Sequence, residues 1–173
     1  MNSSNIIKRA FYPCCAADIL GPLQIMNGMV DEVIFCDKRF PTHRREREKI
    51  IYEAGQDGLP RPIFEPKDVE RLVPHLPDIH IYFYRRDTAQ GEGGSNLYLL
   101  GEKWLTKILE KFPDKGGLII TDGSNCDDNW SKICSAEGFT WEKIGWKFKK
   151  KLNPKIGALL SVIQVERVNN IKI

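Results

Sequence analysis

Residues 31–37, DEVIFCD, give the clearest indication of secondary structure in the chain. The centre of this stretch is a run of apolar and β-branched residues, and acidic residues bound it on both sides, a pattern typical of a β-strand. Because the apolar run is continuous rather than alternating, we expect both faces of this strand to be buried. Burial on both faces is typical of a parallel sheet that helices cover on each side.

Strand-like and helix-like segments alternate outward from this stretch. We expect further strands at residues 8–12, 61–64, 79–84 and 118–122, and helices at 19–29, 44–54, 68–73, 97–112 and 130–136. In the 44–54 helix the spacing assigns Ile50, Ile51 and Ala54 to the buried face. The last two strands, 140–150 and 159–168, follow one another directly and predict an antiparallel pair. We therefore predict one α/β domain over residues 1–173, a mainly parallel sheet flanked by helices with a C-terminal antiparallel strand pair.

The composition is that of a protein that folds around a core. Of the 173 residues, 42% are apolar and 28% are charged, which excludes a disordered chain, a coiled coil and a collagen-like repeat. No run approaches the roughly 18 apolar residues of a membrane span, and the first residues lack the pattern of a signal peptide. We therefore expect a cytoplasmic protein with no membrane partner.

The charge is small in total and uneven in distribution. The formal net charge of +3 does not by itself indicate nucleic acid, but residues 38–49 and 147–151 are basic stretches. Lys147, Lys149 and Lys151 alternate along one predicted strand and so share one face of it. We expect solvated surface there, with the alternative that this face contacts a protein or the phosphates of a nucleic acid.

The residues that follow the strands are the candidates for function, because ligands of doubly wound sheets bind beyond the carboxyl ends of the strands. Residues 13–18 follow the first strand, and their small side chains allow a close approach of the backbone to a ligand. Asp37 ends the 31–37 strand, where an exposed carboxylate accepts hydrogen bonds from the ribose hydroxyls of an adenosine. The alternatives are that Asp37 caps the next helix or pairs with Arg39, and that Asp18 caps the helix after it.

This order of elements resembles the Rossmann-like, seven-stranded fold of S-adenosylmethionine-dependent methyltransferases over about residues 8–168. That family carries an acid-x-Gly-x-Gly-x-Gly pattern after its first strand. Laid over residues 12–18, the pattern places its acid on Tyr12 and its glycines on Cys14, Ala16 and Asp18, so the motif is degenerate and no glycine remains. The resemblance implies S-adenosylmethionine as the cofactor, held by these four residues and by Asp37.

The resemblance leaves the methyl acceptor open. The Asn/Asp-Pro-Pro-Tyr signature of amino-group methyltransferases is absent after the 79–84 strand, where residues 85–88 read RRDT. Asp87 is the candidate catalytic base there, and the alternative is that Asp87 and Asp122 order their loops. Two functions follow. One is a small S-adenosylmethionine-binding protein that acts as a methyltransferase, and the other is a non-catalytic module that binds a protein or nucleic acid through its basic stretches.

The cysteines offer a different chemistry. The five cysteines include no C-x-x-C pair, so we expect reduced thiols rather than disulfides. Cys14, Cys15, Cys36 and Cys126 are expected near the same edge of the sheet, but the spacing of a zinc site is missing and we predict no metal. A cysteine nucleophile would need a neighbouring histidine, and the sequence places none.

The Gly-rich segment at residues 90–95 lacks the Lys-Ser/Thr ending of a P-loop, so it does not predict a nucleotide-phosphate site. We expect it to approach the 97–112 helix, with Ser95 or Asn96 as the N-terminal cap of that helix.

Overall fold

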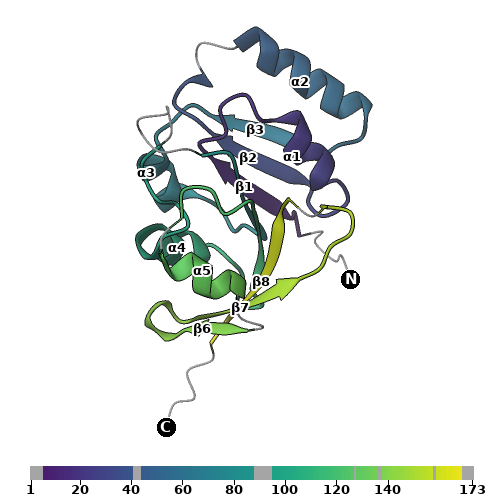
Figure 1. Ribbon diagram of the computed structural model, residues 1–173. Coiled ribbons are helices and arrows are strands. Elements are labelled where there is room, and N and C mark those ends of the chain that lie inside the picture. Colours follow the sequence, from purple (N-terminus) through teal and green to yellow (C-terminus); the bar gives the residue numbers. More distant parts are fainter. Residues whose placement is uncertain are drawn as a thin grey trace, which may run out of the picture.

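The computed structural model describes residues 6–40, 44–87, 95–126, 128–135, 138–157 and 159–168. These residues form one eight-stranded sheet in the order β3-β2-β1-β4-β5-β8-β7-β6, flanked by helices (Figure 1). The strands are β1 (Arg9–Pro13), β2 (Glu32–Cys36), β3 (Arg61–Glu65), β4 (Ile81–Tyr84), β5 (Gly117–Thr121), β6 (Phe139–Trp141), β7 (Trp146–Lys151) and β8 (Ser161–Arg167). The helices are α1 (Leu20–Ile25), α2 (Arg44–Gln56), α3 (Val69–Leu72), α4 (Glu102–Leu109) and α5 (Asp128–Ser135), with 3-10 turns η2 (Val73–His75) and η4 (Glu142–Ile144).

The strands from β3 to β5 in this order are all parallel and form the part of the sheet that the alternation predicts. The chain lays β2 and β3 on one side of β1 and then crosses to the other side for β4 and β5. The order therefore reverses between β1 and β4. In doubly wound sheets, ligands bind beyond the carboxyl ends of the strands at this topological switch point.

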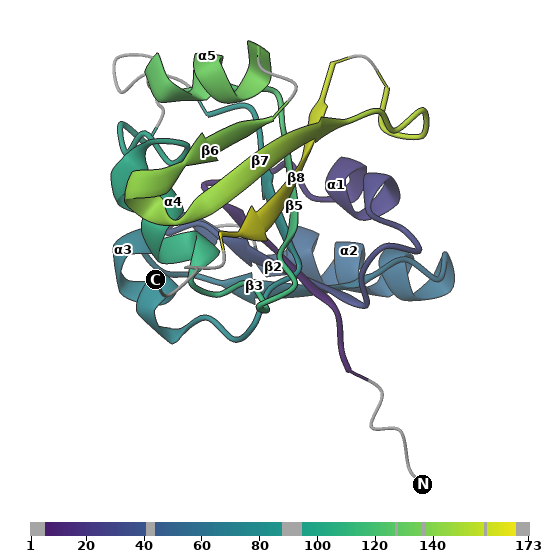
Figure 2. The ribbon, with the colours of Figure 1, turned by 90° about the horizontal axis from the view of Figure 1, so that it is seen from below.

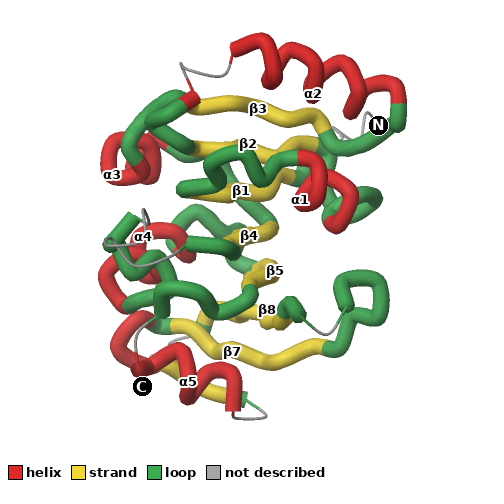
Figure 3. Tube along the Cα trace, turned by 45° about the horizontal axis from the view of Figure 1, so that its top comes forward, coloured by secondary structure: helices red, strands yellow, loops and turns green. Residues whose placement is uncertain are grey.

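The second strand shows why the sheet has a core on each face. All of β2 is buried: Val33 and Phe35 belong to the apolar cluster with α1 and α2, whereas Ile34 and Cys36 belong to the cluster with α3, α4 and α5. These two groups of helices cover opposite faces (Figure 2, Figure 3). Successive side chains of a strand point to opposite faces, so a strand covered on both sides needs a continuous apolar run.

The C-terminal part departs from the prediction in one strand. Where the sequence predicts a single strand at residues 140–150, the chain forms β6 and β7, separated by η4 and by Gly145. Gly145 has a φ of 77°, a left-handed conformation that glycine adopts at no steric cost, and it turns the chain back on itself. The expected antiparallel pair is β7 with β8, and β8 also pairs antiparallel with β5. The sheet thus has one strand more than the seven expected.

Two helices, α1 and α4, are clearly shorter than predicted, and the predicted buried face of α2 is partly wrong. α1 ends at Ile25, and α4 begins only at Glu102. In α2, Ala54 is buried and Ile50 packs against the same cluster, but Ile51 is 46% exposed. Ile50 and Ala54 share a helix face because they are four residues apart, whereas Ile51 is turned about 100° from Ile50. No helix in the described segments is long and apolar enough to span a bilayer.

Candidate functional site

A pocket of about 650 Å³ opens at the carboxyl ends of β1, β2 and β4, on both sides of the topological switch point. Its wall consists of residues that follow separate strands of the sheet. All six residues that the sequence nominates as cofactor-binding or catalytic contribute to it: Tyr12, Cys14, Ala16, Asp18, Asp37 and Asp87. The fold therefore brings these residues together, and their binding and catalytic roles stay predictions.

The loop after β1 has an unusual backbone at the positions that matter for the glycine pattern. Cys14 has a φ of 54° and Ala16 a φ of 48°, both in the left-handed region. A residue other than glycine has a conformational energy there that is roughly 1–2 kcal/mol higher than in its usual conformation. The Cys14 N–H donates to the carbonyl of Cys36 at 2.7 Å, and the Ala16 N–H donates to Oδ2 of Asp37 at 2.8 Å. Two of the three positions under the glycine pattern thus keep the backbone conformation that glycine favours.

Asp37 lies against this loop with its carboxylate fully engaged. Oδ1 accepts hydrogen bonds from the backbone N–H and from Nε of Arg39, and Oδ2 accepts from the Ala16 N–H and from Nη2 of Arg39, all at 2.8–2.9 Å. Burial by itself would raise the pKa of Asp37, but the hydrogen bonds from Arg39 and Ala16 outweigh it and lower that pKa. The predicted alternative of a pair with Arg39 is confirmed. The expectation of an exposed carboxylate is wrong, because the loop and Arg39 leave Asp37 only 5% exposed.

Asp18, in the same loop, pairs with Arg85, the first residue after β4. Nε and Nη2 of Arg85 lie 2.7 and 2.8 Å from the two carboxylate oxygens, and the two side chains are only 12% and 13% exposed. The prediction that Asp18 caps the next helix is wrong. The N-cap residue of α1 is Ile19, whose side chain makes no capping hydrogen bond, and the Asp18 carboxylate is turned toward Arg85 instead. The hydroxyl of Tyr12 lies 2.9 Å from both Oδ2 of Asp18 and the carbonyl oxygen of Arg85. Burial, and then the charge of Asp18, raise the pKa of Tyr12, so its hydroxyl stays a neutral donor.

Arg85 does not line the pocket itself, but it pairs with the pocket residue Asp18, and it is not among the site residues predicted from the sequence. One weak signal points to it, the glycine inside α1. A Cβ atom at Gly21 would lie 2.7 Å from Nη2 of Arg85, so a side chain at this position would require the guanidinium to shift from its place beside Asp18. A glycine in a helix costs up to about 1 kcal/mol relative to alanine and therefore indicates a close approach, but the sequence does not say of which residue.

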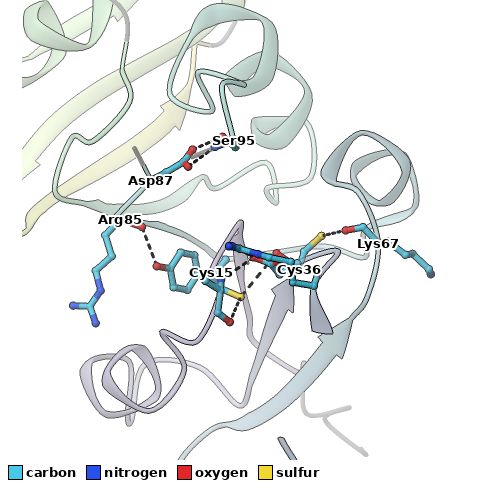
Figure 4. A network of polar contacts seen from close by, with 10 residues as sticks. Cys15, Cys36, Lys67, Arg85, Asp87 and Ser95 are labelled. Carbon is cyan, nitrogen blue, oxygen red and sulfur yellow. Dashed lines mark hydrogen bonds and ion pairs between the residues drawn. The ribbon is translucent and has the colours of Figure 1, made fainter. Parts of the chain in front are cut away.

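Asp87 is 5% exposed and joins three segments of the chain. Its Oδ2 accepts hydrogen bonds from the hydroxyl of Tyr84 and from Nδ2 of Asn125 at 3.1 Å. Ser95 donates its hydroxyl to Oδ2 and its backbone N–H to Oδ1 at 2.8 Å (Figure 4). These bonds order the loops after β4 and β5, as the alternative interpretation of Asp87 expects, and its role as a base stays a prediction. The prediction that Ser95 or Asn96 caps a helix is wrong, because α4 begins further along the chain and the Ser95 hydroxyl is turned to Asp87. Residues 90–94 lie outside the described residues.

Three cysteines line the pocket, Cys14, Cys15 and Cys36. The Cys36 thiol donates to the carbonyl oxygen of Lys67 at 3.1 Å (Figure 4). Burial raises the pKa of Cys14 and Cys36 to about 12 and that of Cys15 well above its ordinary value, so all three are protonated at neutral pH. Metal ligation and nucleophilic attack both need the thiolate. Among the described residues, no group of three or more histidines, cysteines or carboxylates is arranged to hold a metal ion.

Comparison with known proteins finds similar structures but no sequence relative. No family model matches the chain, and no curated protein does. An rRNA methylase from Streptococcus thermophilus matches with a TM-score of 0.50 and 12% identity, over 94% of this chain and 89% of that one. A methyltransferase from Geobacter sulfurreducens matches with a TM-score of 0.51 and 12% identity, over 93% and 71%. A protein from Streptococcus mutans in complex with SAH (S-adenosylhomocysteine) matches with a TM-score of 0.50 and 10% identity, over 94% and 91%.

At such identities the likeness shows the fold. This chain has the Rossmann-like α/β fold of S-adenosylmethionine-dependent methyltransferases, with a parallel N-terminal core and antiparallel C-terminal strands. The resemblance seen in the order of elements along the sequence is thereby confirmed at the level of fold.

Proposed function

We propose that this protein binds S-adenosylmethionine in the pocket beyond β1, β2 and β4 and transfers its methyl group to an acceptor. The observation that carries the proposal is Asp37, a buried carboxylate at the end of β2 that faces the left-handed loop of Cys14 and Ala16. The loop follows β1, which borders the switch point, and Asp37 follows the adjacent strand β2; doubly wound sheets bind nucleosides at these strand ends. The fold shared with methyltransferases supports the same reading.

The residues of the pocket fit this cofactor in size and in chemistry. Pockets for ligands of this kind enclose about 300–1,000 Å³, and this one encloses about 650 Å³. Asp37 carries the oxygens for the two ribose hydroxyls, while Cys14 and Ala16 have side chains small enough for a ligand to approach the backbone. Tyr12 near the end of β1 and Asp18 at the far end of the loop complete this set, and we propose all five as cofactor-binding residues.

When bound, S-adenosylmethionine supplies a methyl group on a positively charged sulfur, already activated for displacement. The work of the protein is then to hold the acceptor in line and to take its proton. We assign the second task to Asp87, whose carboxylate lines the pocket and is fixed in direction by Tyr84, Ser95 and Asn125.

Isothermal titration calorimetry of the whole protein with S-adenosylmethionine and S-adenosylhomocysteine tests the proposal, with NAD as the control nucleotide. We expect one molecule of either adenosyl ligand per chain and no heat with NAD. No heat and no rise in Tm with either adenosyl ligand at millimolar concentration would contradict it. Heat with NAD alone would assign the pocket to another nucleotide and contradict it too.

A second function is favoured by the hairpin of β7 and β8. The residues from 146 to 160 include no acid, and the hairpin exposes five lysines, Lys147, Lys149, Lys150, Lys151 and Lys155. Of the ion pairs within the described parts of the chain, none involves these lysines. β6 pairs with β7 only as far as Phe148, so β7 is an edge of the sheet from Lys149 onward. We propose the phosphates of a nucleic acid as the partner of this surface.

A further inference from the structure

We propose that Arg39 occupies the place of the cofactor ribose on Asp37, so that the Arg39 side chain must leave the carboxylate before a ribose binds and thereby sets the affinity of the pocket. This inference rests on the proposed function, since it concerns the carboxylate that we assign to the ribose. It makes Arg39 a positioning and specificity-determining residue, which acts through Asp37.

The geometry of the carboxylate carries the first step. A carboxylate has about four lone-pair positions, and Asp37 accepts four hydrogen bonds from the protein itself, two on each oxygen. A ribose that donates its two hydroxyls to Asp37 therefore needs two of these four positions to be vacated. As the protein stands, the carboxylate has no free position for either hydroxyl.

The four donors are not equally easy to displace. Two are backbone N–H groups, those of Ala16 and Arg39, and they stay in place as long as the loops do. The other two are Nε and Nη2 of the Arg39 side chain, each 2.9 Å from a different carboxylate oxygen. The two hydroxyls of a ribose would replace these two side-chain donors one for one, one on each oxygen.

The exposure of the two side chains indicates that Arg39, and not Asp37, is the one that moves aside for a ribose. The Asp37 side chain is 4% exposed, whereas the Arg39 side chain is 56% exposed and lines the pocket. The guanidinium reaches water by a change of side-chain rotamer, and water then solvates its charge. The carboxylate keeps its direction throughout, because the backbone donors of Ala16 and Arg39 hold one oxygen each.

The substitution Arg39→Gln tests the inference, and Lys38→Gln is the matched control. Lys38 is an exposed neighbour that lines the same pocket, and its substitution removes the same charge without touching the Asp37 carboxylate. The probes are adenosine and 2′,3′-dideoxyadenosine, which differ only in the two hydroxyls. The quantity measured by calorimetry is the ratio of their dissociation constants, with Tm recorded for each variant.

We expect adenosine to bind Arg39→Gln about tenfold more tightly than wild type, with dideoxyadenosine unchanged, and Lys38→Gln to keep the wild-type ratio. A merely structural role of Arg39 would lower Tm and leave the ratio where it is. An unchanged ratio, or weaker adenosine binding in Arg39→Gln, overturns the inference while leaving the proposed function intact.

A second variant covers the case in which Arg39→Gln fails to fold. Arg39→Lys keeps the charge but has no Nε–H, so one of the two side-chain bonds to Asp37 is lost, and we expect the adenosine ratio to rise by a smaller factor. A ratio in Arg39→Lys equal to that of wild type overturns the inference. Failure of wild type and both variants to bind S-adenosylhomocysteine or adenosine at millimolar concentration overturns the proposed function, and this inference with it.

Discussion

Asp18 and Arg85 are joined by two short hydrogen bonds across the switch point of the sheet, although 67 positions separate them in the chain. The pair ties the loop after β1 to the end of β4, and the pocket opens beside both. Since both side chains are largely buried, the loss of the Asp18 carboxylate leaves the Arg85 guanidinium without its ionic partner in a largely buried position. The pair therefore fixes the wall of the pocket.

The first prediction concerns this pair. Asp18→Asn removes the charge that compensates buried Arg85, and we expect the free energy of unfolding to fall by about 3 kcal/mol in urea denaturation. Glu48→Gln is the control, because Glu48 pairs with Arg44 on the surface of α2, where both side chains are more than half exposed. That variant should lose less than about 0.5 kcal/mol. Equal losses in the two variants would show that the Asp18–Arg85 pair behaves as a surface pair.

The second prediction concerns the backbone of the loop after β1. Ala16→Gly removes the conformational strain of an alanine in the left-handed region, which is worth roughly 1–2 kcal/mol. Glycine also makes the unfolded chain more flexible, which lowers the free energy of unfolding by about 0.5–1 kcal/mol. Because the first effect is larger, the protein should become slightly more stable. Ala17→Gly is the matched control, because Ala17 is also an exposed alanine but does not have a positive φ. It should lose about 0.5–1 kcal/mol. The account of the loop fails if the two glycine variants shift the urea midpoint in the same direction.

The third prediction is a pH dependence. The pKa of Asp37 is lowered in the folded protein, so the unfolded chain takes up the proton at a higher pH than the folded chain does. The stability that follows from this difference is present above the unfolded pKa of about 3.9 and is lost as the pH falls through the lower, folded value. We therefore expect the difference in unfolding free energy between wild type and Asp37→Asn to shrink from about pH 5 downward. Denaturant titrations at a series of pH values measure it, and a difference that does not vary with pH would show that the Asp37 pKa is not lowered.

The fourth prediction concerns the basic hairpin. If Lys147, Lys149, Lys150 and Lys151 each contact a phosphate, log K should fall by about 3.6 for each log unit of salt, since each contact contributes about 0.9. Fluorescence anisotropy with a labelled oligonucleotide at several salt concentrations measures this slope. Lys149→Gln should reduce the slope by about 0.9, the share of one contact. Lys111→Gln should leave it unchanged, because Lys111 follows α4 and its ammonium donates to the carbonyl oxygen of Pro74. Binding that does not respond to salt would rule out phosphate contacts on β7.

Much of the fold could be predicted from the sequence because its signals are local. The continuous apolar run of β2 and the alternation of strands and helices each depend on residues close together in the chain. The break between β6 and β7 depends on a single glycine turn at Gly145 within an otherwise strand-like stretch, and no periodicity marks it. The exposure of Ile51 was missed for a related reason, because the width of the buried face of α2 is set by how the helix lies on the sheet.

In the candidate site, too, contacts between residues close in the chain could be predicted, whereas contacts between distant residues could not. Asp37 and Arg39 are two residues apart, so their pairing could be proposed from the sequence. Asp18 and Arg85 meet because β4 lies beside β1, and the sequence alone does not say which cation faces which carboxylate. The left-handed backbone at Cys14 and Ala16 could not be predicted either, since neither residue has a preference for that conformation.

The two ends of β2 supply the most direct test of the central claim, which is that Asp37 holds the ribose of an adenosyl cofactor. Glu32 and Asp37 are both buried carboxylates paired with arginine, but Glu32 stands at the amino end of β2 with Arg9 and Arg61, at the opposite edge of the sheet from the pocket. The measurement is the dissociation constant of S-adenosylhomocysteine for wild type, Asp37→Asn and Glu32→Gln, with Tm recorded for each. We expect both substitutions to lower Tm, Asp37→Asn to weaken binding at least about a hundredfold, and Glu32→Gln to leave the dissociation constant within about a factor of two. Wild-type affinity in Asp37→Asn, or an equal loss of affinity in both variants, would contradict the claim.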